Sequence, residues 1–486
     1  MTFKTPVAGK IDETITGTTS TVTGKDLIAL GFEQGREIAP ALKTVNELGL
    51  SGADLVAWVA QNKPAPRIRL QDNPGYILNL EASNAEEQDN LDKVRATMDV
   101  LMQTPTLRAG AVMPDACPAG PEGTIPVGGV VAAENAIHPG MHSADICCSV
   151  MVTEFENADP KSILDAVHKA THFGPGGRAN GQRYSMSMDL YDAFRENMFL
   201  SDKKILRAAI EHMGTQGDGN HFAFVGTSKV NGTTCLVTHH GSRGPGAGLY
   251  KLGMRVAERF RKERTTGVLK QNAWIPFDTP EGAAYWDALQ LIRKWTKANH
   301  NCLHQAAAEF AGVSVKERFW NEHNFVFKDG DIFWHAKGAT PVNVDFLPDT
   351  NGMQIVPLNM AEPVLLIRAE VNDRNLGFAP HGAGRNMSRS AHKRAKAGKT
   401  DAEIFSEETK AIDARFFCGR TDISELPSAY KNATEVRRQM DHFGLAEVVD
   451  EIMPYGSIMA GDWEHDAPWK VKAREKHAQK SAKSAL

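Results

Sequence analysis

Apolar residues recur at helical spacing near the start of the chain. Between about Gly24 and Asn62 they return every three or four residues, which is the spacing of one helix face. Thr23 stands just before this segment and can cap its first helix. Two prolines in NKPAPRIRL then interrupt the pattern. We therefore expect a helical N-terminal extension over residues 1–66, although these helices could also be the opening helices of one larger domain.

The following part of the chain mixes strand and helix patterns without a regular alternation of the two. Strand patterns occur at residues 150–155, 233–240, 329–340 and 361–371. Helix patterns occur at residues 159–173 and 283–312, the second of them long. The expected fold class is α+β, with a central β-rich core surrounded by helices over residues 67–461. Residues 462–486 form a basic C-terminal tail, for which a solvated or disordered end is expected.

The composition indicates the cellular compartment and the kinds of partner that we expect. The 486 residues are 42% hydrophobic and 23% charged with a formal net charge of −4, so no whole-protein field attracts nucleic acid. A polyanion would need local patches, and the basic stretch at residues 385–399 is one candidate. The sequence has no apolar run of membrane-spanning length and no apolar signal segment at its N-terminus. Six cysteines in so long a chain do not make a disulfide framework, and a cytoplasmic, membrane-free protein is expected.

Five residues of the kinds that bind metal ions lie in or beside turns rich in glycine or asparagine. They are Asp145 and Cys148 in SADICCSV, His221 in GDGNHF, His239 in THHGSRG and His323 in EHNF. Thiolate, carboxylate and imidazole groups together suit a borderline divalent ion such as Mn²⁺, Co²⁺ or Zn²⁺. Each of these residues taken singly is more often structural. Together they indicate a two-metal centre in which one thiolate bridges both ions.

A further motif, PHGAGRNMSR, has the features of a phosphate site. The glycines at 382 and 384 let backbone amides approach an anion, and Arg385 and Arg389 supply bidentate donors. His381 opens this loop and can act as a nucleophile on a nucleoside triphosphate. Asp115 in MPDACPAG is a candidate carboxylate to orient that imidazole. The alternative is a simple anion-binding turn with a spectator histidine.

These motifs, in this order, resemble those of the RtcB family of RNA-splicing ligases. The likeness runs from MPDACPAGPEGTIPVGG through HPGMHSADICC, GDGNHF, THHGSRG, EHNF and HAKGAT to PHGAGRNMSR and LPSAYKNATEV. It covers most of the chain after about Arg67. The resemblance implies an RtcB-like fold and a GTP- and Mn²⁺-dependent ligase. Such an enzyme joins RNA ends bearing a 3′-phosphate or 2′,3′-cyclic phosphate to a 5′-hydroxyl.

The resemblance also implies roles for individual residues. Asp145, Cys148 and His221 would hold one Mn²⁺ ion, and Cys148, His239 and His323 the other. His381 would carry GMP, with Asp115 as its orienting partner. The residues expected to bind the nucleotide or an RNA phosphate are Asn220, Arg243, Gly382, Ala383, Gly384, Arg385, Arg389 and Tyr430.

The sequence departs from the family pattern where guanine would be recognised. Phe224 stands in place of an acidic residue, and Met459 or Ala460 in place of a lysine. The segment PLNMAEPV at residues 357–364 lacks two serines of the family's segment. Met151 replaces an arginine, and Cys117 replaces a histidine in the PDAC motif. Nucleotide transfer through His381 is therefore expected, while the identity of the base stays open.

Three functions agree with these observations. The first is a Mn²⁺-dependent RNA ligase that works through a histidine–GMP intermediate. The second is a related nucleotidyltransferase with altered nucleotide or end specificity, acting on nucleic-acid ends. The third is a non-catalytic paralogue that binds RNA or metal. The retention of His381 together with Asp115 favours the first two, because metal storage needs neither residue.

Overall fold

The computed structural model describes residues 21–32, 34–35, 37–347, 351–467 and 471–472. It divides into two compact units, residues 1–68 and residues 69–486. Most of the predicted basic tail, at 468–470 and 473–486, lies outside the described residues. Within the described part, no helix is both long and apolar enough to cross a membrane.

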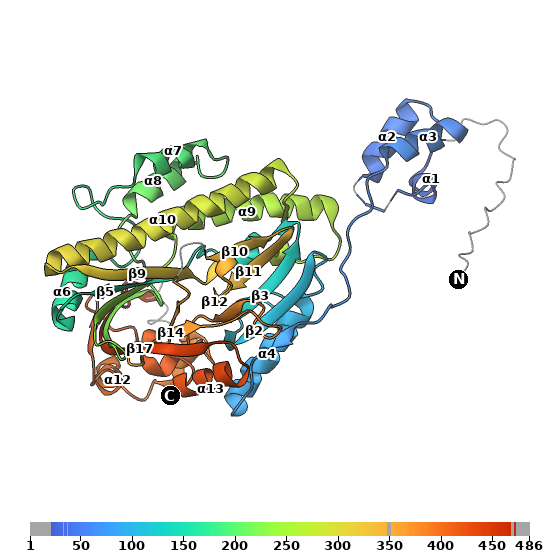
Figure 1. The fold of residues 1–486 in the computed structure, drawn as a ribbon. Coiled ribbons are helices and arrows are strands. Elements are labelled where there is room, and N and C mark those ends of the chain that lie inside the picture. Colours follow the sequence, from blue (N-terminus) through green and yellow to red (C-terminus); the bar gives the residue numbers. More distant parts are fainter. Residues whose placement is uncertain (1–20, 33, 36, 348–350, 468–470, 473–486) are drawn as a thin grey trace. The chain divides into compact units, whose positions relative to one another are not determined.

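The first unit is a group of three short helices. They are α1 (Gly24–Ala29), α2 (Ile38–Glu47) and α3 (Gly52–Asn62) (Figure 1). Thr23 precedes α1, and its backbone N–H and hydroxyl both donate to the Asp26 carboxylate, at 2.8 and 2.6 Å. Leu27, Val45 and Val59 are buried between the helices. The predicted helical segment is thus confirmed, with breaks between the helices.

The larger unit contains two main sheets, and neighbouring strands in each sheet often come from distant parts of the chain. The first sheet has the order β1-β2-β3-β11-β10 within the described residues. Its strands are β1 (Ile77–Leu78), β2 (Leu107–Cys117), β3 (Val127–Glu134), β10 (Asn324–Asp329) and β11 (Ile332–Lys337). Among these strands, β1 and β2 pair in parallel, and the other pairs are antiparallel.

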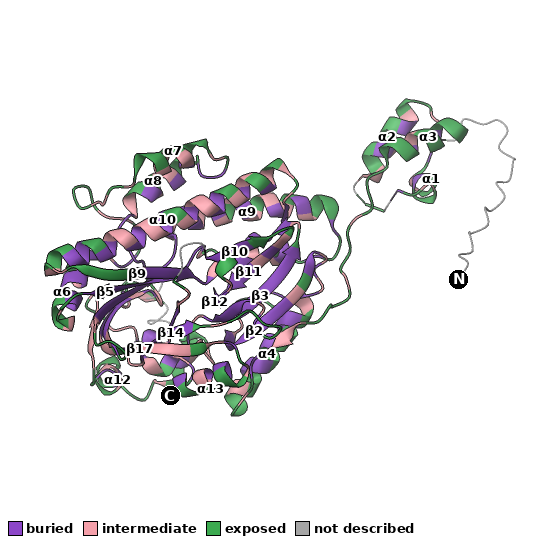
Figure 2. Ribbon diagram, viewed as in Figure 1, coloured by how far each residue is buried: buried purple, intermediate pink, exposed green. Residues whose placement is uncertain are grey.

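The second sheet, built likewise from the described residues, has the order β13-β14-β17-β6-β7-β5-β9, with β16 paired to β17. Its strands are β5 (Ser149–Phe155), β6 (Phe222–Ser228), β7 (Thr234–His240), β9 (Val315–Glu322), β13 (Gln354–Pro357), β14 (Val364–Arg368), β16 (Asp413–Phe416) and β17 (Glu447–Met459). Every residue of β5 and β7 is buried. These two neighbouring strands are therefore covered by the rest of the unit, and Figure 2 shows β5 as buried.

Short strand pairs and helices complete the larger unit. The pairs join β4 (Ala136–Ile137) to β8 (Ile275–Pro276) and β12 (Ala339–Pro341) to β15 (Phe378–Pro380). The helices are α4 (Ala85–Leu101), α5 (Pro139–His142), α6 (Pro160–Ala170), α7 (Met188–Glu196), α8 (Lys203–Glu211), α9 (Arg243–Arg264), α10 (Pro280–Ala311), α11 (Arg389–Ala395), α12 (Asp401–Glu408) and α13 (Ala433–His442). Helices α9 and α10 lie along one side of the sheets, whereas α4 and α13 lie on the other and contact β2 (Figure 1).

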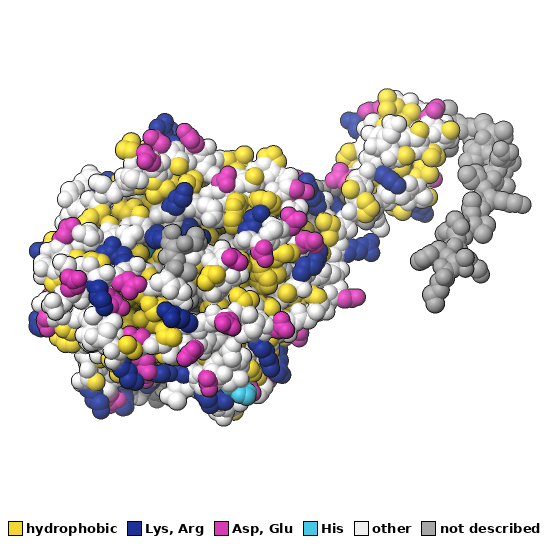
Figure 3. Space-filling model, viewed as in Figure 1, with side chains coloured by type: hydrophobic (Ala, Val, Ile, Leu, Met, Phe, Trp, Pro, Cys, Tyr) yellow, Lys and Arg dark blue, Asp and Glu magenta, His cyan; other side chains and the backbone are white. Residues whose placement is uncertain are grey.

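The expected α+β class and the elements that carry it are confirmed. The predicted strands at 150–155, 233–240, 329–340 and 361–371 overlap β5, β7, β11 with β12, and β14. The predicted helices at 159–173 and 283–312 correspond to α6 and α10. On the face seen in Figure 3, acidic and basic side chains are interspersed, which agrees with the small net charge.

Helix α10 has clear start and stop signals. The Thr279 hydroxyl accepts a hydrogen bond from the Gly282 N–H, and Pro280 occupies the first turn, where a missing N–H costs nothing. The helix ends at Gly312, which has a φ of +68°. Glycine adopts this left-handed conformation without the penalty that a Cβ would bring.

Polar side chains, in addition to apolar ones, connect α10 to the second sheet. The Thr238 hydroxyl lies 2.7 Å from both His300 Nδ1 and His304 Nε2. His300 Nε2 continues to the Ser149 hydroxyl at 3.1 Å, and His304 Nδ1 to the Thr153 hydroxyl at 2.7 Å. Burial lowers the pKa of both histidines well below the ordinary value. The connection is therefore a chain of neutral imidazoles and hydroxyls.

Two further buried histidines behave in the same way near the first sheet. Burial lowers the pKa of His138 to about 3 and that of His142 to about 4. His138 Nε2 lies 2.8 Å from the Thr106 hydroxyl, and His142 Nε2 lies 3.1 Å from the Tyr285 hydroxyl. The folded protein thus keeps several imidazoles uncharged at pH values where an unfolded chain would protonate them.

We expect stability to fall in mild acid. In the unfolded chain these histidines have a pKa of about 6.5. Below that pH the unfolded chain binds protons that the folded chain does not, so the free energy of unfolding falls as the pH is lowered. Each such histidine lowers the free energy of unfolding by about 1.4 kcal/mol at pH 5.5. Urea unfolding with a metal chelator present, at pH 7.5 and 5.5, measures this loss. His138→Gln should reduce it, whereas the exposed His442→Gln is the matched control. An unchanged pH dependence in His138→Gln would contradict this account.

Candidate metal and histidine site

The five predicted metal-type residues meet because neighbouring strands of the second sheet end at one edge. The order β6-β7-β5-β9 places four strands side by side. His221 directly precedes β6 and Cys148 directly precedes β5, while His239 lies in β7 and His323 directly follows β9. In the β5–β7 register, Val150 stands opposite His239. Antiparallel neighbours bring such alternate starts and ends to the same edge, although the residues are far apart in sequence.

A tight turn presents Asp145 and Cys148 to this edge. The Cys148 N–H donates to the Asp145 carbonyl at 3.2 Å, and Cys147 between them has a φ of +57°. The Cys147 N–H donates to the Asn324 carbonyl at 2.7 Å, and the His323 N–H donates to the Cys148 carbonyl at 2.9 Å. Backbone bonds thus fix this turn against the segment that carries His323.

The side-chain atoms form two groups of three that share one sulfur. Cys148 Sγ lies 3.1 Å from His239 Nε2 and 3.6 Å from His221 Nε2. His239 Nε2 lies 3.1 Å from His323 Nε2, and His221 Nε2 lies 3.2 Å from Asp145 Oδ2. The triplets Cys148–His239–His323 and Asp145–Cys148–His221 each have ligand atoms within 4.8 Å of one another. Each triplet has the donors to hold one metal ion.

Backbone carbonyls set the tautomers of two of these imidazoles. His221 Nδ1 lies 2.5 Å from the Gln216 carbonyl oxygen, and His239 Nδ1 lies 3.0 Å from the Asn220 carbonyl oxygen. A carbonyl oxygen only accepts, so both Nδ1 atoms carry the proton and both Nε2 atoms carry a lone pair. These lone pairs converge on Cys148 Sγ. Such a gathering of acceptors suits a cation, and carbonyl partners of this kind orient metal-binding histidines.

The electrostatics of the site point the same way. Burial, reinforced by Asp145, raises the pKa of the Cys148 thiol well above its ordinary value. Burial lowers the pKa of His239 to about 3 and that of His323 well below the usual range. Burial would raise the pKa of Asp145, but His221 and Cys148 outweigh it and hold the carboxyl ionised. A divalent ion would supply the missing positive charge and displace the thiol proton, as metal binding to cysteine requires.

His381 lies beside this cluster and is held by Asp115, as predicted from the sequence. His381 directly follows β15, and Asp115 lies in β2 with no exposed surface. Asp115 Oδ2 accepts from His381 Nδ1 at 2.5 Å and from the His381 backbone N–H at 3.2 Å. The proton on Nδ1 leaves Nε2 with its lone pair. The rings of His381 and His323 are 4.8 Å apart between centroids, so His381 adjoins the Cys148–His239–His323 triplet.

The loop after His381 packs tightly on β2. Gly384 has a φ of +71°, and a Cβ there would overlap the Asp115 carbonyl oxygen. Lys431, which is nearly buried, donates from Nζ to the carbonyls of Pro114 and Ala116 at 3.0 and 2.7 Å. These contacts fix the backbone on both sides of Asp115. Glycine at 384 is thus needed for close approach, in addition to any role in binding an anion.

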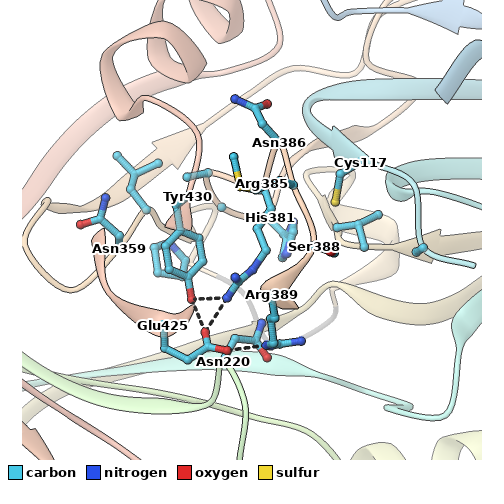
Figure 4. A pocket seen from close by; sticks show the side chains of 18 of the residues that line it. Cys117, Asn220, Asn359, His381, Arg385, Asn386, Ser388, Arg389, Glu425 and Tyr430 are labelled. Atoms are coloured by element: carbon cyan, nitrogen blue, oxygen red, sulfur yellow. Dashed lines mark hydrogen bonds and ion pairs between the residues drawn. The ribbon is translucent and has the colours of Figure 1, made fainter. Parts of the chain in front are cut away.

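A cavity of about 1100 Å³ opens beside His381. Several predicted nucleotide-binding residues line it, namely Asn220, Gly382, Ala383, Gly384, Arg385, Arg389 and Tyr430. Figure 4 shows how Glu425 holds three of them. Glu425 Oε2 accepts from Arg385 Nη2 and from the Tyr430 hydroxyl, both at 2.6 Å, and Glu425 Oε1 accepts from Arg389 Nε at 2.7 Å. One carboxylate thus binds two guanidinium groups, and the Arg385 and Arg389 side chains together keep a surplus positive charge.

Arg243 is placed differently from the other predicted phosphate ligands. It does not line the cavity beside His381. Its Nη2 donates to the Gly174 carbonyl at 3.0 Å and its Nε to the Thr215 hydroxyl at 3.2 Å. Its backbone has a φ of +53° at the first residue of α9. A Cβ on Gly217 would overlap the Arg243 guanidinium and approach His221 Nδ1, which places Arg243 on the His221 side of the cluster.

The basic stretch at 385–399 is largely neutralised within the protein. Lys393, Lys396 and Lys399 pair with Asp422, Glu408 and Glu407 at 2.9, 3.0 and 2.5 Å. Together with the two arginines on Glu425, most of its cations have internal partners. The three lysines are therefore paired, whereas Arg385 and Arg389, which share one carboxylate, keep a surplus positive charge.

Glu425 and Lys431 were not predicted from the sequence as parts of the site. Glu425 lies 40 residues from Arg385 and 36 from Arg389, and Lys431 lies more than 300 residues from the carbonyls that it binds. No local sequence pattern indicates pairs so far apart. The one available signal was position, since Lys431 follows Tyr430 within the motif LPSAYKNATEV and Glu425 directly precedes that motif.

Comparison with known proteins agrees with this geometry. The family model described as tRNA-splicing ligase RtcB matches residues 193–460, slightly more than half of the chain. The tRNA-splicing ligase RtcB of Aeropyrum pernix is 27% identical over 428 residues, covering 71% of this chain and 86% of that protein. The RNA-splicing ligase RtcB of Mycobacterium bovis is 24% identical over 405 residues, covering 68% of this chain and 93% of that protein.

Three of the predicted site residues precede the part that the family model matches, namely Asp115, Asp145 and Cys148. The strand order of the second sheet brings Asp145 and Cys148 to His221, His239 and His323. The contact between β2 and β15 brings Asp115 to His381. The matched residues, the relatives matched over most of their length and the α+β fold agree with one another, and the chain belongs to the RtcB family.

Proposed function

We propose that this protein is a Mn²⁺-dependent RNA ligase that works through a nucleotide carried on His381. The single observation that carries the proposal is the short hydrogen bond from His381 Nδ1 to the buried Asp115, beside two ligand triplets and a large cavity. A histidine held only for structure would not need to line such a cavity. The names of the related proteins, which are RNA- and tRNA-splicing ligases, support RNA as the substrate.

The first step uses His381 as a nucleophile. Asp115 keeps the proton on Nδ1, so Nε2 attacks the α-phosphorus of a nucleoside triphosphate. An N–P bond forms, the bond to the β-phosphate oxygen breaks, and pyrophosphate leaves. Arg385 and Arg389 stand on the cavity wall where the phosphates would lie. Because they share one carboxylate, they keep positive charge for an anion. GTP is the donor that the resemblance implies.

The later steps transfer and release the nucleotide. An oxygen of the RNA 3′-phosphate attacks the nucleotide phosphorus, and His381 leaves with its electron pair. The 5′-hydroxyl of the second RNA end then attacks the activated 3′-phosphorus and releases the nucleoside monophosphate. A 2′,3′-cyclic phosphate end would first be opened by water. Bound divalent ions supply charge neutralisation at the phosphates during these displacements.

The donor set fits this role without selecting one metal by itself. Thiolate and imidazole donors also suit Zn²⁺ and Co²⁺, whereas carboxylate suits Mn²⁺. Mn²⁺ is proposed because the family resemblance implies it. The two triplets share Cys148, so these residues would hold two ions, which would neutralise charge on a bound phosphate. The non-catalytic alternative has no observation in its favour, because Asp115 and His381 serve no metal-storage purpose.

The His381 step predicts a covalent protein–nucleotide adduct. With Mn²⁺ and a nucleoside triphosphate labelled at the α-phosphate, the protein should acquire an acid-labile label. His381→Ala should abolish the label, and Asp115→Asn should slow its formation by at least about 100-fold, because the tautomer is no longer fixed. His442→Ala, at an exposed histidine, is the control.

The corresponding ligation assay uses RNA ends bearing a 3′-phosphate and a 5′-hydroxyl, compared with ends bearing a 3′-hydroxyl and a 5′-phosphate. Joining only the first pair supports the proposal. Bound metal without an adduct from any nucleoside triphosphate would point instead to a binding protein.

The shared sulfur predicts a linked loss of two ions. After loading with Mn²⁺ and desalting, elemental analysis should find about two ions per chain in the unchanged protein. Cys148→Ala should lower the content of both ions, because each triplet loses its common donor. Cys147→Ala is a matched control, since that buried neighbour belongs to neither triplet. Retention of one full ion in Cys148→Ala would show that the sulfur is not shared.

A further inference from the structure

The cavity beside His381 has an apolar wall formed by two adjacent strands. In the antiparallel register of β6 and β17, Phe222 stands opposite Met459 and Phe224 stands opposite Ser457. All four residues line the cavity. Alternate residues of a strand point to the same face, so the four side chains form one continuous surface. We refer to these four residues as the β6–β17 wall.

Further apolar residues extend this surface. Leu358 and Met360 follow β13, Val364 begins β14, and all three line the same cavity. Phe222 packs in one apolar cluster with Met360 and Met459, and in another with Phe224 and Val364. A flat aromatic ring would meet aromatic faces and methionine sulfur here, which are favourable partners for such a ring.

One polar atom on the wall has no partner within the described part of the chain. The Ser457 hydroxyl is buried, with 1% of the residue exposed, and makes no hydrogen bond there. A buried hydroxyl without a partner is costly, and native structures rarely leave one so. Because Ser457 lines the cavity, a bound ligand can supply the missing partner.

The wall carries no ionised acceptor that is free to bind a ligand. Both oxygens of Glu425 are engaged by Arg385, Arg389 and Tyr430. The other acidic residues that line the cavity, Glu86 and Asp89, belong to α4, which packs on β2 of the first sheet. The β6–β17 wall therefore offers apolar surface and one hydroxyl to whatever ring lies against it.

We propose that the β6–β17 wall receives the base of the nucleotide donor, and that this base is adenine rather than guanine. Guanine carries N1–H and N2–H₂ donors and an O6 acceptor on its pairing edge, and this surface leaves most of them unmatched. Adenine carries one amino group and one ring nitrogen there, and the Ser457 hydroxyl can bond either. A site with unpaired polar groups against one ligand discriminates strongly. We expect adenine to be preferred by about tenfold or more.

This inference rests on the proposed function, because it takes the cavity as the site of the nucleoside triphosphate that His381 attacks. The donor class is then adenosine triphosphate. The same chemistry at His381 follows, with AMP in place of GMP on Nε2 and pyrophosphate again released. Phe224 and Met459, two positions at which the sequence departs from the family pattern, lie together on this wall in the strand register.

The test compares two donors on the full-length protein with Mn²⁺. ATP and GTP, each labelled at the α-phosphate and supplied separately at the same subsaturating concentration, give the rates of acid-labile labelling. Labelling at least tenfold faster from ATP supports the inference. Equal rates, or faster labelling from GTP, would overturn it while leaving the proposed His381 chemistry standing.

Binding to His381→Ala separates the two proposals. This variant forms no adduct, so calorimetric titration with ATP and with GTP in the presence of Mn²⁺ reports the base preference alone. Tighter ATP binding without any labelling of the unchanged protein would support the adenine site and sink the proposed covalent chemistry. Binding of neither nucleotide would overturn the adenine site.

A charge placed on the wall provides the converse test. Ser457→Asp sets a carboxylate where guanine N1–H and N2–H₂ could bond, so the ratio of ATP to GTP labelling should fall by about tenfold. Thr227→Asp is the matched control, because Thr227 lies on β6 but does not line the cavity. An unchanged ratio in folded Ser457→Asp would overturn the assignment of this wall.

If Ser457→Asp does not fold, Ser457→Ala replaces it. Loss of the hydroxyl should slow labelling from ATP by about tenfold while sparing labelling from GTP. Equal slowing with both donors would count against a base contact at Ser457.

Discussion

The register of β6, β7, β5 and β9 is the constraint on which the site depends. Side chains alternate between the two faces of a sheet, so a slip of one residue would move His239 to the opposite face and leave Cys148 without its neighbour. The chain of hydroxyls and imidazoles from α10 to Ser149, Thr153 and Thr238 opposes such a slip, because each of its hydrogen bonds fits one register only. Specific polar contacts in a covered core thus fix positions that apolar packing alone would hold less exactly in register.

Burial gives the histidines of this protein two different characters. Those between α10 and the sheet are neutral and bond only to uncharged partners. His221 and His381, in contrast, each lie beside a carboxylate, Asp145 and Asp115 respectively. Asp115 accepts from His381 Nδ1 and so fixes that tautomer, whereas at His221 the Gln216 carbonyl does so and Asp145 lies beside Nε2. A neighbouring carboxylate also lets an imidazole tolerate developing positive charge.

Much of the fold could be predicted because its elements carry local signals. The alternation in β5 and β7 and the long periodic run of α10 mark those elements directly. The residue types of the metal cluster and the pairing of His381 with Asp115 were also accessible, through motifs and a family resemblance. Their convergence was expected too, but the strand order that produces it was not, because it pairs β17 with β6 and β5 with β9 across long stretches of chain. The Glu425 anchor was missed because no local pattern links residues so far apart, and Arg243 lies on the His221 side of the cluster and does not line the cavity beside His381.

The two triplets differ in how they meet the solvent. The Asp145 side chain is 39% exposed, whereas Cys148, His239 and His323 are each exposed by 4% or less. Ions on the Asp145 side would therefore come and go readily, while those between the two deeper imidazoles would exchange slowly. A preparation that has been stripped and briefly reloaded could hold one kind of ion in the outer position and a leftover ion of another kind in the inner one. Bulk stoichiometry alone would then hide a mixed-metal centre.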